Sequence, residues 1–204
     1  DRLKFSHSLQ TALAAGGLPV PAILLTVNQP SWTQTHGRKF VLFDHIEGQR
    51  YRGESEQVAA AGRALGVLHS KALQFENPVP EDLFDLAFGH IELLTEVLGA
   101  RGSLSASIED LEVLRRDLQL AKESAEKSGW LVQPRIAVHG DYNPWNVLFD
   151  ENKNVCGILD FDNCDMGSRL HDVAEGIVTF SLVQYRRDST NFASHLPLYF
   201  RDEL

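Results

Sequence analysis

The residues best suited to chemistry lie in one polar loop between two short apolar runs. The loop reads His139-Gly140-Asp141-Tyr142-Asn143-Pro144-Trp145-Asn146, and Asp160 follows at the end of a third apolar run. The amide and carboxylate oxygens of Asn146 and Asp160 are hard ligands that suit Mg²⁺, which retains waters and binds phosphate oxygens. Asp141 is then free to orient a hydroxyl group and to accept its proton. The pattern therefore favours a magnesium site with a free carboxylate beside it.

Short strands and amphipathic helices are expected to position this loop. Apolar runs predict strands at residues 22–27, 40–43, 136–138, 147–149 and 155–159, and a polar loop at residues 28–39. Helical periodicity predicts helices at residues 3–15, 56–70, 82–98 and 108–127, the first of them stopped by Gly16-Gly17. A last helix is expected to place Ala174, Ile177, Ser181 and Tyr185 on one face. The chain is therefore predicted to be an α+β protein in which helices dominate.

Composition narrows the class of protein. The 204 residues, 43% of them apolar, fit one globular domain or a large part of one. A net charge of -9 disfavours a nucleic-acid partner. No apolar run approaches the ~20 residues that a membrane span needs, and no secretory signal follows Asp1. Cys156 and Cys164 are too few for a disulfide framework, so we expect a cytoplasmic protein.

The same motifs resemble the catalytic core of the aminoglycoside phosphotransferase and choline kinase-like family, which includes type II homoserine kinases. His-Gly-Asp-x4-Asn at 139–146, followed by Ile-Leu-Asp at 158–160, is similar to the catalytic loop and metal motif of these relatives of protein kinases. Phe43-Asp44-His45-Ile46-Glu47-Gly48 resembles their hinge. Two further segments fit, Ala64-Leu65-Gly66-x-Leu68-His69 in the first large-lobe helix and Arg169-x-x-Asp172-Val173-Ala174 after the metal loop. The resemblance implies a protein-kinase-like fold, with a partial small lobe and hinge at 1–47 and a helical large lobe at 48–204.

The resemblance implies a role for each matching residue of the catalytic region. Asp141 would be the catalytic carboxylate that faces the hydroxyl of the phosphate acceptor. Asn146 and Asp160 would hold Mg²⁺ against the phosphates of ATP. His139 and Asp172 would brace the catalytic loop without reacting. Phosphoryl transfer asks mainly for positioning and charge neutralisation, which this small set of groups can supply.

The hinge implies the nucleotide site and hence the reaction. Backbone groups of Asp44 and Ile46 would hydrogen-bond the adenine edge, and Phe43 would line the pocket behind it. The expected reaction is transfer of the γ-phosphate of ATP to a hydroxyl of a small molecule, such as an aminoglycoside, homoserine, choline or a sugar. A protein Ser/Thr acceptor is an alternative. Residues 76–127 are acidic, which favours an amine-bearing acceptor, although a plain solvated surface explains that charge better.

The departures from the family pattern support a second hypothesis. The Gly-rich strand pair and the lysine that clamps the phosphates do not occur, and no Asp or Glu lies between Leu3 and Pro30, where Ser6 or Ser8 takes the expected position of an acid. The chain is therefore expected to be a fragment without its N-terminal strands or a divergent member of the family. The same departures favour, as a second function, a non-catalytic nucleotide-binding module. A metal hydrolase that uses His139, Asp141, Asp160 and Asp162 is a third interpretation, but it explains neither Asn146 nor the hinge.

Overall fold

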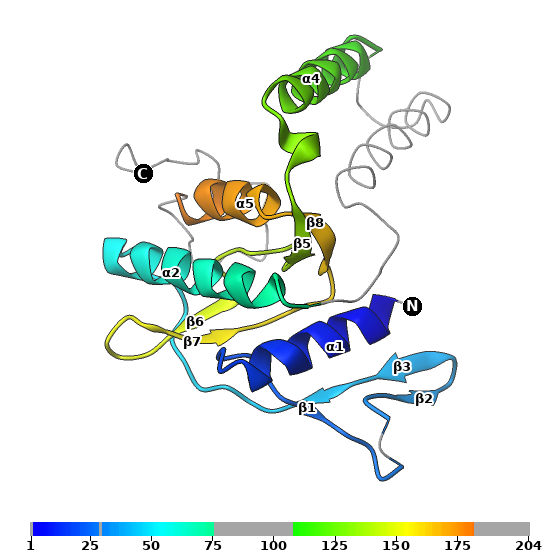
Figure 1. The fold of residues 1–204 in the computed structure, drawn as a ribbon, viewed down its shortest axis with the longest axis vertical. Coiled ribbons are helices and arrows are strands. Elements are labelled where there is room, and N and C mark those ends of the chain that lie inside the picture. The colour runs from blue at the N-terminus through cyan, green and yellow to red at the C-terminus, as the bar shows by residue number, and fades with distance from the viewer. Residues whose placement is uncertain (1, 29, 76–107, 182–204) are drawn as a thin grey trace.

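Helices and two-stranded antiparallel ladders make up the protein (Figure 1), and the computed structural model describes residues 2–28, 30–75 and 108–181. In chain order the elements are α1 (Arg2–Ala15), β1 (Ile23–Leu24), β2 (Thr33–Thr35), β3 (Arg38–Phe40), β4 (Leu42–Phe43), α2 (Ser55–Ala72), α4 (Ile108–Lys127), the 3-10 turn η1 (Trp130–Val132), β5 (Arg135–Val138), β6 (Val147–Phe149), β7 (Val155–Ile158), β8 (Asp165–Ser168) and α5 (Leu170–Phe180). The ladders pair β1 with β4, β2 with β3, β5 with β8 and β6 with β7. The α+β class predicted from the sequence is confirmed.

Helix α1 joins the small ladders near the N-terminus to the larger helical part (Figure 1). It ends where the sequence predicts, because Gly17 adopts a φ of 84° and the Leu18 N–H caps the carbonyl of Leu13 at 3.1 Å. Phe5, Leu9 and Leu13 are buried along one side of the helix and belong to the main hydrophobic core. This core also takes in α2 and strands β5 to β7. The two strands that flank the polar loop are therefore anchored in the hydrophobic core.

Three strands occur wholly or mostly where the sequence predicts loops. β2 and β3 form a hairpin across the polar stretch 28–39, with Phe40 at its end, and the hairpin is closed at His36 and Gly37, which have φ values of 50° and 74°. Positive φ at both central residues is the requirement of the tight hairpin turn, but the strand residues are all exposed and give no apolar alternation. β8 has the sequence Asp-Met-Gly-Ser, which carries no strand signal, and its pairing with β5 depends on residues about thirty positions earlier.

The face predicted for the last helix is buried only in part. Ser181, just after α5, is buried, but Ile177 is 57% exposed and Ala174 is also exposed, whereas Asp172, Gly176 and Phe180 are buried. The helix is rotated because the carboxylate of Asp172 is turned inward, where it binds the polar loop. Tyr185 and the predicted helix at 82–98 lie outside the described residues.

Helix α4 has the bounds that its periodicity predicts. Of the helices that the structure describes, none is both long and apolar enough to cross a membrane.

Candidate active site

The polar loop between β5 and β6 is held in place by one buried carboxylate, that of Asp172. Asp172, at the start of α5, is fully buried and accepts hydrogen bonds from the backbone N–H groups of His139 and Gly140 at 2.9 and 2.8 Å. The Nε2–H of His69, on α2, donates to the same carboxylate at 2.8 Å. Burial acts to raise the pKa of Asp172, but the hydrogen bonds from His69, Gly140 and His139 outweigh it and hold the pKa below its ordinary value. Asp172 therefore fixes the start of the loop as an ionised group.

His139 connects the loop to the strand that ends at Asp160. Its Nε2 lies 2.9 Å from the carbonyl oxygen of Leu159, and its Nδ1 lies 3.3 Å from the backbone N–H of Asp141. A carbonyl can only accept and an amide can only donate, so the ring is neutral with its proton on Nε2. Burial lowers the pKa of His139 and keeps it in this form, although Asp172 and the Leu159 carbonyl act in the opposite direction. This arrangement fits a bracing role rather than acid–base chemistry.

Asp141 and Asn146 are brought together by the turn of the loop. The Nδ2 group of Asn146 donates to the Oδ2 atom and to the backbone carbonyl of Asp141, each at 2.9 Å. Asn143 donates to the other carboxylate oxygen of Asp141 at 2.7 Å. Two amide groups thus fix the direction of the carboxylate. Because the nitrogen of Asn146 is used inside the loop, its side-chain oxygen is turned to the other side as a potential ligand.

Asp160 lies near Asn146 because the residue before it, Leu159, forms a backbone hydrogen bond with Asn146. The Leu159 N–H donates to the Asn146 carbonyl at 2.8 Å, and Asp160 is the next residue. Asp160 has a φ of 62°, a conformation that Asp tolerates better than most residues, and its side chain is exposed. The described residues contain no cluster of three His, Cys, Asp or Glu side chains that could hold a metal alone. Any ion bound here therefore needs waters or substrate oxygens as further ligands.

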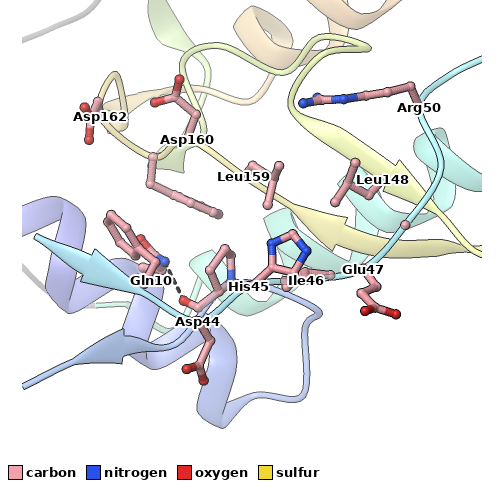
Figure 2. A pocket seen from close by; sticks show the side chains of 14 residues that line it. Gln10, Asp44, His45, Ile46, Glu47, Arg50, Leu148, Leu159, Asp160 and Asp162 are labelled. Atoms are coloured by element: carbon pink, nitrogen blue, oxygen red, sulfur yellow. Dashed lines mark hydrogen bonds between the residues drawn. The ribbon is translucent and has the colours of Figure 1, made fainter.

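A cavity of about 680 Å³ opens between the segment after β4 and this strand end (Figure 2). We call it the hinge cavity. Its lining includes all three residues predicted to bind a nucleotide, Phe43, Asp44 and Ile46, and also Asp160. The Asp44 N–H already donates to the Ala22 carbonyl at 2.9 Å, so of its two backbone polar groups only the carbonyl is left for a ligand.

Helix α1 also contributes to the hinge cavity, but through a residue that the sequence analysis passed over. Gln10 lines the cavity and donates to the Pro21 carbonyl at 2.5 Å, whereas neither Ser6 nor Ser8 is among the lining residues. Ser6 is buried and bonds within its own helix, and Ser8 is exposed. The helix residue that faces the cavity is therefore a neutral amide.

Glu175 is a second residue that the sequence analysis missed. It lies one turn along α5 from Asp172, accepts a hydrogen bond from the Tyr142 N–H at 3.2 Å and forms a carboxyl pair with Asp141. Burial first, and then the hydrogen bond and the negative charge of Asp141, together raise the pKa of Glu175 from its ordinary 4.5 to about 7. A protonated Glu175 can donate to Asp141, so the loop carboxylate has a third neighbour that holds it.

The raised pKa of Glu175 predicts an unusual dependence of stability on pH. Between the ordinary pKa of 4.5 and about 7, the folded protein binds a proton at Glu175 that the unfolded chain releases, so this group stabilises the fold less as the pH rises. Glu175→Gln keeps a donor toward Asp141 and removes the charge. We expect it to raise the free energy of unfolding at pH 8 by about 1 kcal/mol, reduced from the full shift because the side chain is only half-buried, and to change nothing at pH 5. Urea unfolding of the wild type and the variant, without metal and at both pH values, measures this. The same difference in the free energy of unfolding at pH 5 and pH 8 would contradict the prediction.

Comparison with known proteins agrees with this geometry. The profile of the phosphotransferase enzyme family (APH) matches residues 1–190. No curated protein matches the chain significantly. Amicoumacin kinase hAmiN, solved with AMP-PNP, Ca²⁺ and Ami, has a TM-score of 0.67 and 14% identity over 90% of this chain and 55% of its own.

Two aminoglycoside phosphotransferases are similar at the same level. The enzyme from Alicyclobacillus acidocaldarius has a TM-score of 0.63 and 18% identity over 88% of this chain and 58% of its own. APH(3'')-Id from Streptomyces rimosus, solved with ADP and streptomycin, has a TM-score of 0.57 and 18% identity over 87% of this chain and 66% of its own. The chain thus spans somewhat more than half the length of these proteins and shares their protein-kinase-like fold. On the family match, this chain belongs to the phosphotransferase enzyme family.

Proposed function

We propose that the chain carries the catalytic loop, metal site and hinge of an ATP- and Mg²⁺-dependent phosphotransferase that acts on a hydroxyl group of a small molecule. The observation that carries the proposal is that hydrogen bonds connect Asp141 to Asn146 and Asn146 to the backbone beside Asp160, and that Asp160 lines the hinge cavity. In this proposal residues 1–47 are a partial small lobe with the hinge, and residues 48–204 are the large lobe.

The hinge cavity supports binding of a nucleotide base. Phe43 forms part of its wall, and its ring meets that of His7 edge-on at 6.4 Å. The Asp44 carbonyl and the Ile46 N–H would pair with the adenine edge, since the Asp44 N–H is already bonded to Ala22. A ligand fixed at this end would direct its phosphates toward Asp160 at the far wall.

The oxygen donors fit Mg²⁺ better than a metal that needs a full protein cage. Asn146 offers a neutral amide oxygen and Asp160 an exposed carboxylate, and Mg²⁺ usually takes one or two such ligands together with waters and phosphates. These two residues would hold the ion, which when bound would neutralise phosphate charge. A Zn²⁺ site would need His or Cys donors. The described residues contain no cluster of three His, Cys, Asp or Glu side chains that could supply them.

Asp141 would act on the hydroxyl that receives the phosphate. The amides of Asn143 and Asn146 hold its carboxylate in one direction, so that it can accept a hydrogen bond from the hydroxyl and orient the oxygen for attack. The proton of the hydroxyl would pass to this carboxylate as the new O–P bond forms and the bond from the γ-phosphorus to the β–γ bridging oxygen breaks, with ADP as the leaving group. Asp172, His139 and the Leu159 backbone would keep the loop in place throughout.

The acceptor is proposed only as a class. The similar structures include an amicoumacin kinase and phosphotransferases solved with streptomycin, gentamicin or kanamycin, compounds that carry both hydroxyl and amine groups. An aminoglycoside, homoserine, choline or a related amino alcohol is therefore the class we would screen first. The acidic segment 76–127 that favours an amine lies largely outside the described residues, so this preference depends on the sequence alone.

The proposed metal site predicts that Asp160→Ala weakens ATP binding in the presence of Mg²⁺. We expect a loss of about 10-fold or more, because a charged ligand of the ion is removed, and a smaller loss without Mg²⁺. Calorimetric titration with ATP, with and without Mg²⁺, measures both. Glu151→Ala is the matched control, since it removes the same charge from the exposed turn between β6 and β7. Equal affinities of Asp160→Ala and Glu151→Ala would refute the metal site.

A nucleotide-binding module without catalysis is the second candidate function. It is favoured by one observation, that α1 presents the neutral Gln10 to the hinge cavity and contains no acid. The two candidates can be distinguished by mixing the full-length protein with ATP and an acceptor. An enzyme transfers phosphate to the acceptor, and Asp141→Asn abolishes the transfer. A binding module binds ATP but does not consume it.

A further inference from the structure

The charges around the hinge cavity are unbalanced for a phosphorylated ligand. Four carboxylates line it, those of Asp44, Glu47, Asp160 and Asp162. Among the described residues of this lining, Arg50 is the only arginine and none is a lysine. Nucleoside diphosphates and triphosphates are polyanions, so this wall offers them one permanently charged cation.

The residues on both sides of Arg50 are held in place, Gln49 by its backbone and Tyr51 by its side chain. Gln49 pairs with Phe149 at the end of β6, through hydrogen bonds of 2.7 and 2.9 Å that run in both directions. The hydroxyl of Tyr51 donates to the Phe180 carbonyl at 2.7 Å. Arg50 therefore leaves the chain from a defined position, although it is itself exposed.

The side chain of Arg50 runs toward the metal end of the cavity. Figure 2 shows it extending past Leu148 in the direction of Asp160. Its Nη1 donates to the backbone carbonyl of Trp145, the residue before Asn146 in the catalytic loop. The guanidinium is thus held next to the loop that supplies the proposed metal ligand.

Most of the hydrogen-bonding capacity of Arg50 is left over. A guanidinium has five N–H donors, and the Trp145 carbonyl is neutral and takes one nitrogen. No carboxylate in the described part of the chain forms an ion pair with Arg50, although four line the same cavity. A planar fork of donors with no anionic partner matches phosphate oxygens in charge and in shape.

We propose that Arg50 binds a phosphate group of the nucleotide at the edge of the metal site. The inference rests on the proposed function, because it requires a nucleotide in the hinge cavity. The contact would bring a fixed positive charge to a wall that is otherwise acidic. It would also join the bound phosphates to the catalytic loop through the Trp145 carbonyl.

The proposal predicts an effect that grows with the phosphates of the ligand. Calorimetry with Mg²⁺ compares adenosine, ADP and AMP-PNP on the wild type, Arg50→Gln and Arg50→Lys. We expect Arg50→Gln to weaken ADP and AMP-PNP about 10- to 100-fold and to leave adenosine unchanged, because a charged contact is lost while an amide donor for Trp145 remains. Arg50→Lys should recover part of the affinity, since it keeps the charge but not the fork.

Arg52→Gln is the matched control, because Arg52 is exposed nearby and does not line the cavity. It should bind all three ligands like the wild type. Equal weakening of adenosine and ADP in Arg50→Gln would make Arg50 a ribose or structural residue and overturn the proposal, as would no weakening at all. If Arg50→Gln does not fold, Arg50→Lys carries the same comparison. A wild type that binds none of the ligands refutes the proposed function itself, whereas wild-type binding that ignores Arg50 refutes only this inference.

Discussion

Replacement of Gly140 by alanine is expected to lower the free energy of unfolding by about 3 kcal/mol or more. A Cβ atom at this position would lie 2.2 Å from the backbone oxygen of Asn163, and Gly140 has a φ of 77°. The obstacle is backbone, so no side chain can rotate away to make room. Gly140 also donates its N–H to Asp172, so a shift of the loop would lengthen that hydrogen bond. Urea unfolding of the wild type and the variant measures the difference.

Gly66→Ala is the matched control for the same chemical change. Gly66 lies inside α2 with open space where a Cβ would be, and alanine is a better helix former than glycine by about 1 kcal/mol. The control should therefore be as stable as the wild type or more stable. A Gly140→Ala protein as stable as Gly66→Ala would mean that the loop does not hold the conformation described here.

Asp172→Asn is also expected to lower the free energy of unfolding strongly, by about 3 kcal/mol. Both carboxylate oxygens of Asp172 accept hydrogen bonds, one from Gly140 and the other from His139 and His69. An amide has one accepting oxygen, so in either orientation its NH₂ group faces a buried donor. Urea unfolding at pH 7 measures the loss.

Asp150→Asn separates this effect from the general cost of exchanging a carboxylate for an amide. At Asp150 one oxygen, Oδ1, accepts from the backbone N–H groups of both Asn152 and Asn154, in the turn between β6 and β7, while the other accepts only a long, exposed bond of 3.4 Å from the side-chain amide of Asn154. An amide oxygen can take over both bonds, so we expect a loss of about 0.5 kcal/mol or less. Equal losses at Asp150 and Asp172 would show that the buried carboxylate does not organise the loop.

The parts of the site that the sequence predicts are those with a local signature. Asp141 and Asn146 stand in one short loop between apolar runs, and Asp160 ends a third run, so chain connectivity alone brings them near each other. The end of α1 is likewise local, because it depends on the φ that only glycine adopts easily. Such features need no knowledge of distant residues.

The contacts that sequence reasoning missed join distant residues. His69 stands in a segment that resembles the family, but its partner Asp172 lies 103 residues away and no local pattern pairs the two. Glu175 has the appearance of a surface residue on a helix until the fold brings it to Asp141. The inward turn of Asp172 also sets which side of α5 is buried, and apolar periodicity alone does not predict that a carboxylate lies on that side.

The main chain and the side chain of Leu159 have different roles. Its N–H and carbonyl hold Asn146 and His139, while its side chain lines the hinge cavity. Every amino acid except proline offers the same N–H and carbonyl, so a substitution here alters the cavity wall and leaves both ties intact. A substitution at this position can therefore reshape the cavity and change which ligands fit it, while the hydrogen bonds that hold the loop stay the same.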